Sequence, residues 1–325
     1  MGSGFNFLLN AINVSPAALG WRDVDVSAHV PLGSTGVLLD ICNSAAVAEH
    51  WADVRKNGSA DDDYANGRLT IRTHRYAIVP LDVNRIFEAQ IDHVAVQIWL
   101  IGYCDTSVVF LDPRVDKSAA ALGWQDVDCS AEVSADATGI IVKFITTLAA
   151  QEQIRMKGSA DDRAMPGVIN NSWKFCTIGV NALKLAEQKV DDLAADLYLI
   201  GYVKPPITFF MNSIDISIAA LLAWTDDDLT AVTEPSADGA IIDMYHGGAG
   251  DRMNLRKNGS GDSRTDTFVY DDEFGYVGLD LGNIFEGYIQ NADNDFFLVG
   301  YTKPLVAPPK PKGTIAMHAK LAGII

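Results

Sequence analysis

Residues 21–27 read Trp-Arg-Asp-Val-Asp-Val-Ser, and the same pattern returns twice along the chain. Residues 124–130 read Trp-Gln-Asp-Val-Asp-Cys-Ser, and residues 224–230 read Trp-Thr-Asp-Asp-Asp-Leu-Thr. Each copy follows a short segment rich in alanine and leucine. Self-similarity at a fixed spacing indicates an internal repeat, and the repeat decides the fold before any single element is considered.

Two further segments recur in the same order in every copy. The first holds an arginine followed by a Gly-Ser-x-Asp turn, and the second closes each repeat with Gly-Tyr. Together with the tryptophans, the shared residues are Trp21, Trp124, Trp224, Arg55, Arg155, Arg256, Gly58, Gly158, Gly259, Tyr103, Tyr202 and Tyr301. Three blocks in a constant order define a repeat of roughly a hundred residues, which is the size of a small domain.

Within each repeat, apolar residues alternate or form short runs that end at turn residues, a pattern typical of β-strands. Residues 183–195 have a helical composition, but they align with a strand expected at 85–91. About seven strands per repeat favour a β-sandwich, and we prefer a jelly-roll-like topology. We therefore predict an all-β chain of three tandem sandwich domains and an extended tail. The predicted boundaries are 1–105, 106–204, 205–305 and 306–325.

Composition narrows the classes of function. The chain of 325 residues has a formal net charge of -17. Nucleic-acid binding depends on cationic side chains that contact phosphates, so this excess of negative charge argues against nucleic acid as a partner. No apolar run reaches the length of a membrane span, and residues 1–9 do not resemble a signal peptide. We expect synthesis in the cytosol. The four cysteines match no zinc or redox spacing, so we interpret them as small buried side chains.

The repeated Trp-x-Asp-x-Asp places two carboxylates on one side of an extended strand. Because Ca²⁺ prefers several oxygen ligands, these acids are candidate calcium ligands, although the EF-hand spacing is absent. The alternative is that they cap turns or pair with the repeated arginines. The candidates are Asp23, Asp25, Asp126, Asp128, Asp226 and Asp228. We expect no other cofactor.

No catalytic motif is recognisable in the sequence. None of the six histidines recurs at equivalent positions, and no nucleophile elbow or glycine-rich nucleotide loop is present. A catalytic site usually occupies one place in a chain, whereas the features repeated here are scaffold. The Gly-Ser-x-Asp segment is interpreted as a turn that needs a positive φ at glycine. The repeated tryptophans and tyrosines are interpreted as core residues, with an aromatic ligand platform as the alternative.

The tail differs from the acidic body. From Phe296 onward the chain contains no Asp or Glu, and prolines around residues 304–311 favour an extended course. The following segment reads as an apolar strand that docks on a neighbouring subunit by strand addition, or folds back on the third repeat. The candidate docking residues are Ile315, Met317, Leu321 and Ile324.

With its tandem units, acidic surface and adhesive tail, the chain loosely resembles multi-domain β-sandwich proteins of bacteriophage virions, of the decoration, head-fibre or tail-appendage type. The resemblance implies a non-enzymatic assembly protein on a particle surface that binds itself or other subunits. Two alternatives remain open. One is an adhesin that binds host-surface glycans, and the other is a glycan hydrolase with a carboxylate pair.

Overall fold

A computed structural model of the protein describes residues 2–163, 170–246, 251–263 and 273–304. The all-β prediction is confirmed, because the regular structure in these ranges is strand apart from one short 3₁₀ turn, η1 (Tyr64–Asn66). No helix in the described ranges is long and apolar enough to cross a membrane. Each repeat builds two small antiparallel sheets, and every sheet takes its strands from a single repeat.

The first sheet of each repeat has four strands. In spatial order they are β1 (Phe5–Asn13), β8 (Val96–Cys104), β3 (Gly36–Asn43) and β6 (His74–Pro80) in repeat 1. Repeat 2 uses β9 (Val108–Asp116), β15 (Ala195–Val203), β11 (Gly139–Thr146) and β13 (Ser172–Gly179), with β13 and β9 at the two edges. Repeat 3 uses β16 (Thr208–Asp215), β22 (Asn294–Thr302), β18 (Gly239–His246) and β20 (Glu273–Gly278).

The second sheet of each repeat lies further out. Repeat 1 orders β2 (Arg22–Asp25), β7 (Ile86–Ile91), β4 (His50–Lys56) and β5 (Arg68–Leu69). Repeat 2 orders β10 (Gly123–Asp128), β14 (Leu185–Val190) and β12 (Glu152–Met156). Repeat 3 orders β17 (Thr225–Asp228), β21 (Ile284–Ile289) and β19 (Met253–Lys257). Strand β14 confirms that the segment of helical composition at 183–195 contains the strand expected by alignment.

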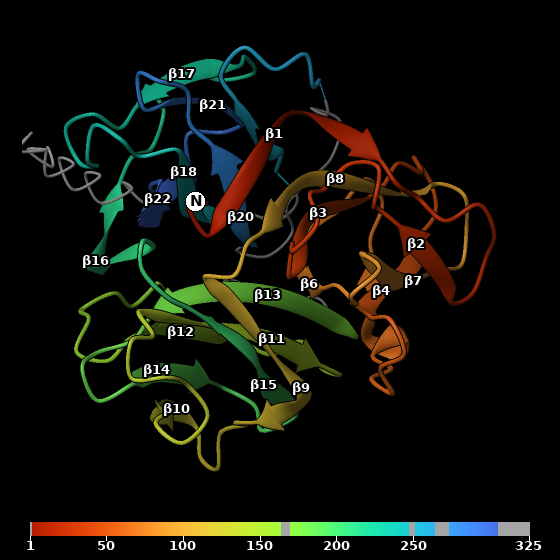
Figure 1. Ribbon diagram of the computed structural model, residues 1–325, viewed down its shortest axis with the longest axis horizontal. Helices are drawn as coiled ribbons and strands as arrows, with labels where there is room; N and C mark the ends of the chain where they lie inside the picture. The colour runs from red at the N-terminus through yellow and green to blue at the C-terminus, as the bar shows by residue number, and fades with distance from the viewer. Residues whose placement is uncertain (1, 164–169, 247–250, 264–272, 305–325) are drawn as a thin grey trace, which may run out of the picture.

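The predicted arrangement as three tandem jelly-roll-like sandwiches is wrong. The six small sheets, two from each repeat, are arranged as a six-bladed β-propeller. The three repeats surround a common centre, and the second sheet of each repeat lies farther from it than the first (Figure 1). The physical reason is burial on both faces. In a sandwich, inner and outer side chains alternate along a strand, but every residue of β3, β11 and β13 is buried. These strands are covered from both sides because neighbouring repeats pack against them.

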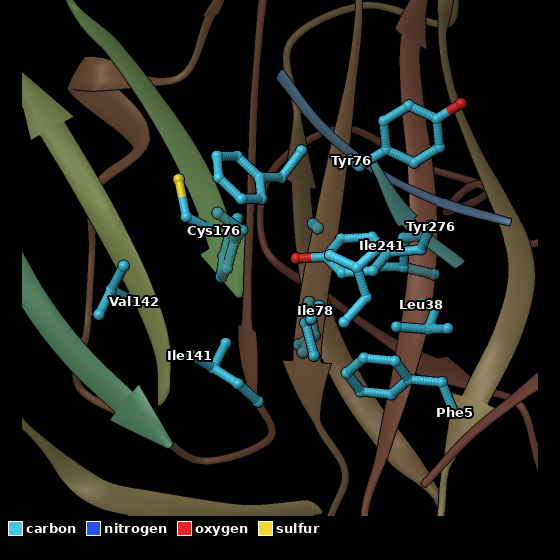
Figure 2. Packing of buried hydrophobic residues seen from close by; sticks show 14 of the residues in the cluster. Phe5, Leu38, Tyr76, Ile78, Ile141, Val142, Cys176, Ile241 and Tyr276 are labelled. Carbon is cyan, nitrogen blue, oxygen red and sulfur yellow. The ribbon is translucent and has the colours of Figure 1, made fainter. Parts of the chain in front are cut away.

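The centre is made by one edge strand from each repeat. Strands β6, β13 and β20 contact one another, and a single apolar core runs through all three repeats. Tyr76, Cys176 and Tyr276 come from these three strands and lie in that core (Figure 2). The Tyr276 hydroxyl lies 2.9 Å from Thr177 Oγ1 and satisfies a polar atom in the interior. The repeats therefore share one interior.

The ring closes because each repeat inserts a phenylalanine from its first strand against glycines of the preceding repeat. A Cβ atom at Gly36 would lie 2.5 Å from the ring of Phe110, and one at Gly139 would lie 2.4 Å from Phe209. A Cβ at Gly239 would lie 2.1 Å from Phe7, so only glycine permits these approaches. Phe7 of repeat 1 thus packs on repeat 3, and the contact that joins successive repeats also joins the last to the first.

Candidate functional site

Two of the three repeated segments meet in each repeat, where the tryptophan and the arginine contact each other and the arginine binds a glutamate that the sequence analysis did not single out. The Arg55 guanidinium carbon lies 3.8 Å from the Trp21 ring centroid, and Arg55 Nε donates to Glu88 Oε2 at 2.7 Å. The matching stacks are 3.7 Å for Arg155 on Trp124 and 4.2 Å for Arg256 on Trp224. Their glutamate partners are Glu187 and Glu286. Because an arginine covers a face of each indole, the tryptophans are held in internal cation–π contacts.

The Gly-Ser-x-Asp segment is a turn in all three repeats, as predicted. Gly58, Gly158 and Gly259 have φ values of 76°, 94° and 77°, which only glycine adopts at low cost. Within the first turn, Ser59 Oγ accepts the N–H of Asp61 at 3.1 Å, and Arg55 Nη1 donates to the Asp61 carbonyl at 2.7 Å. The same two contacts occur in the other repeats. The arginine therefore links the tryptophan to the turn.

These turns have a second role that sequence reasoning missed, which is to dock one repeat on the next. Asn212 Oδ1 accepts the N–H of Ala160 at 2.7 Å, and Asp161 Oδ2 accepts the N–H of Ser213 at 2.9 Å. At the junction of repeats 3 and 1, Asn10 Oδ1 accepts the N–H of Gly261 at 2.9 Å. The only available signal was that Asn10 and Asn212 occupy aligned positions of the first strand.

The candidate calcium ligands are exposed on β2, β10 and β17, and the second of each pair ends its strand. The second carboxylate of each pair caps a turn: Asp25, Asp128 and Asp228 accept the N–H two residues ahead at 2.8, 2.9 and 2.8 Å. Hydrogen bonds from Ser27 and Ser130 lower the pKa of Asp25 and Asp128. Asp126 pairs with Lys157 at 2.6 Å, while Asp23 and Asp226 sit opposite glutamates. Within the described ranges, no three His, Cys, Asp or Glu residues form a metal-binding group.

Asp227 departs from its aligned neighbours. It occupies the position of Val24 and Val127, which are buried, and it is itself partly buried. Burial, with a smaller contribution from the charge of Asp228, raises the pKa of Asp227 to about 6. The third repeat therefore places an acid where the other two place an apolar side chain.

A cluster of buried charged side chains lies between repeats 1 and 2. Lys143 Nζ on β11 donates to Asp53 Oδ1 on β4 and to Asp63 Oδ2, each at 2.9 Å. Arg114 on β9 also binds Asp63, with Nη2 to Oδ1 at 2.9 Å. A pocket beside this cluster is lined by all four residues and by Phe175. Sequence reasoning missed this cluster entirely, because its members are far apart in the chain.

The cluster sets distinct charge states on its two carboxylates. Burial raises the pKa of Asp53 despite the opposing charge of Lys143. Burial also acts to raise the pKa of Asp63, but Lys143 and Arg114 outweigh it and bring that pKa to about 2. For Lys143, burial acts to lower the pKa, yet Asp53 and Asp63 raise it. Asp63 is therefore the carboxylate that stays ionised.

The junction of repeats 2 and 3 uses the same positions with the opposite polarity. Arg163, which aligns with Asp63, donates from Nη2 to Asp243 Oδ2 at 2.6 Å. Asp243 aligns with Lys143, so acid and base have exchanged places between the two junctions. Each junction is electrically complementary in its own way.

The remaining predicted residues divide between the strand ends and core of the repeats and the tail. Tyr202 and Tyr301 are buried and Tyr103 is half-buried, at the ends of their strands. All four cysteines are buried thiols, and burial raises the pKa of Cys129 to about 12. The predicted docking residues Ile315, Met317, Leu321 and Ile324 lie outside the described residues. No protein-family model and no curated protein matches the chain.

Proposed function

We propose that this chain is a non-enzymatic structural protein, a rigid three-repeat body that docks on a larger assembly through residues 306–325. The observation that carries the proposal is that the repeated residues form contacts within each repeat and between repeats. In every repeat the tryptophan, arginine and Gly-Ser-x-Asp turn contact one another, and the aspartate of the turn contacts the next repeat. The residues that recur in all three repeats thus stabilise the structure of the repeats and the contacts between them. The resemblance to virion proteins, and a location on a particle surface, stay predictions.

A glycan-binding adhesin remains the second candidate, but the repeated tryptophans favour it less. Sugar rings stack on open indole faces, whereas arginines lie over Trp21, Trp124 and Trp224. A glycan hydrolase is the weakest candidate. It needs two carboxylates with separated pKa values in an accessible cleft, and the Asp53–Asp63 pair is instead neutralised by Lys143 and Arg114.

The proposal is tested by the size and shape of the protein in solution. Light scattering and negative-stain imaging would compare the full chain with a chain ending at Pro304, which retains all the described strands. We expect defined oligomers or filaments for the full chain and monomers for the shorter one. A full-length Ile315→Asn/Leu321→Asn variant is the matched control, because it keeps the length and the basic charge of the tail and removes only apolar side chains. Monomers in every sample would contradict self-assembly, and glycan binding would then lead.

A further inference from the structure

The amine of Lys143 is held against two carboxylates in the interior between repeats 1 and 2. Its Nζ lies 2.9 Å from Asp53 Oδ1 and 2.9 Å from Asp63 Oδ2. The side chains of Lys143, Asp53 and Asp63 are only 5%, 1% and 7% exposed. The ring centroids of Trp173 and Phe175 each lie 5.3 Å from the same nitrogen. The Lys143 amine is therefore held beside the two carboxylates, next to the rings of Trp173 and Phe175.

The surrounding backbone is arranged around the Asp53 carboxyl group. The N–H of Val54 donates to Asp53 Oδ1 at 2.8 Å, and the N–H of Asp63 donates to Asp53 Oδ2 at 2.9 Å. Fixed N–H donors of this kind stabilise an oxyanion that develops on a carboxyl oxygen. Asp63 contributes both its N–H and its carboxylate, so one residue contacts the carboxyl group and the amine together.

We propose that Lys143 and Asp53 condense to an isopeptide bond, with Asp63 relaying the proton. A proton first passes from the Lys143 ammonium to the Asp53 carboxylate along their hydrogen bond. The neutral Nζ then attacks Asp53 Cγ, forming the C–N bond, while the negative charge develops on Oδ2 beside the Asp63 N–H. The Asp63 carboxylate takes a proton from the nitrogen and returns it to Oδ1, which departs as water. Ammonium and carboxylate thus become an amide and one water molecule, without oxidant or co-reactant.

The protonation states of the three side chains decide which group accepts the proton and which relays it. They also limit the rate of the reaction. Because burial raises the pKa of Asp53, this carboxyl group is the one that accepts a proton. Asp63, with a pKa of about 2, remains the anion that a proton relay requires. The pKa of Lys143 is raised, so the neutral amine is scarce and the reaction is slow. Fixed proximity offsets part of this cost, since orientation within a protein replaces a bimolecular encounter.

The constellation does not recur at the next junction. At the aligned positions of the next junction the chain has Gln153, Asp243 and Arg163, which include no primary amine. The bond would tie β4 of repeat 1 to β11 of repeat 2 across a separation of 90 residues. A cross-link that closes a loop of this length restricts the unfolded chain and so favours the folded ring.

The direct test is the intact mass of the purified full chain, measured under denaturing conditions during incubation of the folded protein at 37 °C. We expect a species lighter by one water molecule to accumulate. Proteolysis should then release a branched peptide that joins the fragment containing Lys143 to the fragment containing Asp53. If the mass stays that of the linear sequence throughout incubation, the proposal is wrong.

Two variants and one internal control sharpen the test. Lys143→Arg keeps a cation between the carboxylates but has no nucleophilic amine, so it should never lose water. Asp63→Asn should slow the loss at least tenfold, and an unchanged rate would remove Asp63 from the reaction. Circular dichroism confirms that each variant is folded. Lys56 and Asp112 lie 2.6 Å apart but are solvent-exposed, and cross-linking there to the same extent would show that the buried geometry is not the cause.

Discussion

Arg163 of repeat 2 donates to Asp243 of repeat 3 at 2.6 Å, and this ion pair reverses the polarity found one junction earlier. At the first junction the acid comes from the preceding repeat and the base from the following one; at the second the order is inverted. If repeat 3 followed repeat 1 directly, Asp63 and Asp243 would bring two acids together in the interior. Like-charge contacts in a buried site disfavour incorrect partners. The inversion therefore specifies the order of the repeats.

Reversing one charge at this junction should destabilise the ring. Arg163→Asp places two acids together, and we expect a loss of about 3–5 kcal/mol in the free energy of unfolding. Adding Asp243→Lys restores an opposite pair and should recover part of the loss. Urea denaturation of the two single variants, Arg163→Asp and Asp243→Lys, and of the double variant measures the coupling between the two positions. A double variant as unstable as the sum of the single changes would argue against complementarity as the cause.

Valine occupies the positions aligned with Asp227 in the other two repeats. Asp227→Val should increase the free energy of unfolding, and the increase should be larger at higher pH. The folded-state pKa of Asp227 is about 6, above its usual 3.8, so folding favours the protonated acid. The resulting penalty grows between about pH 4 and pH 6 and persists above it. We expect Asp227→Val to add about 1–2 kcal/mol at pH 7, since partial exposure reduces the effect, and less at pH 4. Melting temperatures across this range report the change. Thr225→Val, on the same strand, removes no ionisable group and should lack this pH dependence.

The stacked arginines should not tolerate lysine. Arg155→Lys retains the charge but loses the planar stack on Trp124 and the paired donors to Glu187 and the Asp161 carbonyl. We expect a loss of about 1–3 kcal/mol in the free energy of unfolding. Arg22→Lys, at an exposed arginine beside Trp21, serves as the control and should change stability by less than about 0.5 kcal/mol. Equal effects at both sites would contradict a structural role for the stack.

Truncating Phe7 should loosen the closure between repeats 1 and 3. We expect Phe7→Ala to cost about 2–3 kcal/mol, because the ring fills the space beside Gly239 and Gly278. Amide hydrogen exchange should accelerate first in β1 and β20, which meet at this junction. Leu9→Ala, on the same strand but 53% exposed, should leave exchange in β20 unchanged. Uniform acceleration across all three repeats would indicate global rather than local opening.

The strands were predictable because their determinants are local. Alternation marked β7, a continuous apolar run marked β3, and glycine with a positive φ marked each repeated turn. Their arrangement was not predictable from these signals. An apolar run indicates burial on both faces but does not say whether the covering surface comes from the same repeat or the next one. That ambiguity led to sandwiches in place of a propeller.

The charged junctions were missed for a related reason. Asp63 and Arg163 each follow a Gly-Ser turn, where a charged residue normally faces solvent, and Lys143 lies within an apolar run. The only clue was the exchange of sign at aligned positions. Such an exchange acquires meaning only once these positions are known to face each other across a junction. Long-range pairing of this kind has no local sequence signature.

Because Phe7 packs on the glycines of repeat 3, repeats 3 and 1 are in contact just as successive repeats are, although no peptide segment joins them in that order. Circular permutation should therefore be tolerated. A chain that starts at repeat 2, continues through repeat 3 and reaches repeat 1 through an added linker preserves every junction. A chain in the order 1, 3, 2 has the same composition but mismatches the ion pairs. The stability of the ring therefore depends on which repeats contact each other, and not on which repeat comes first in the chain.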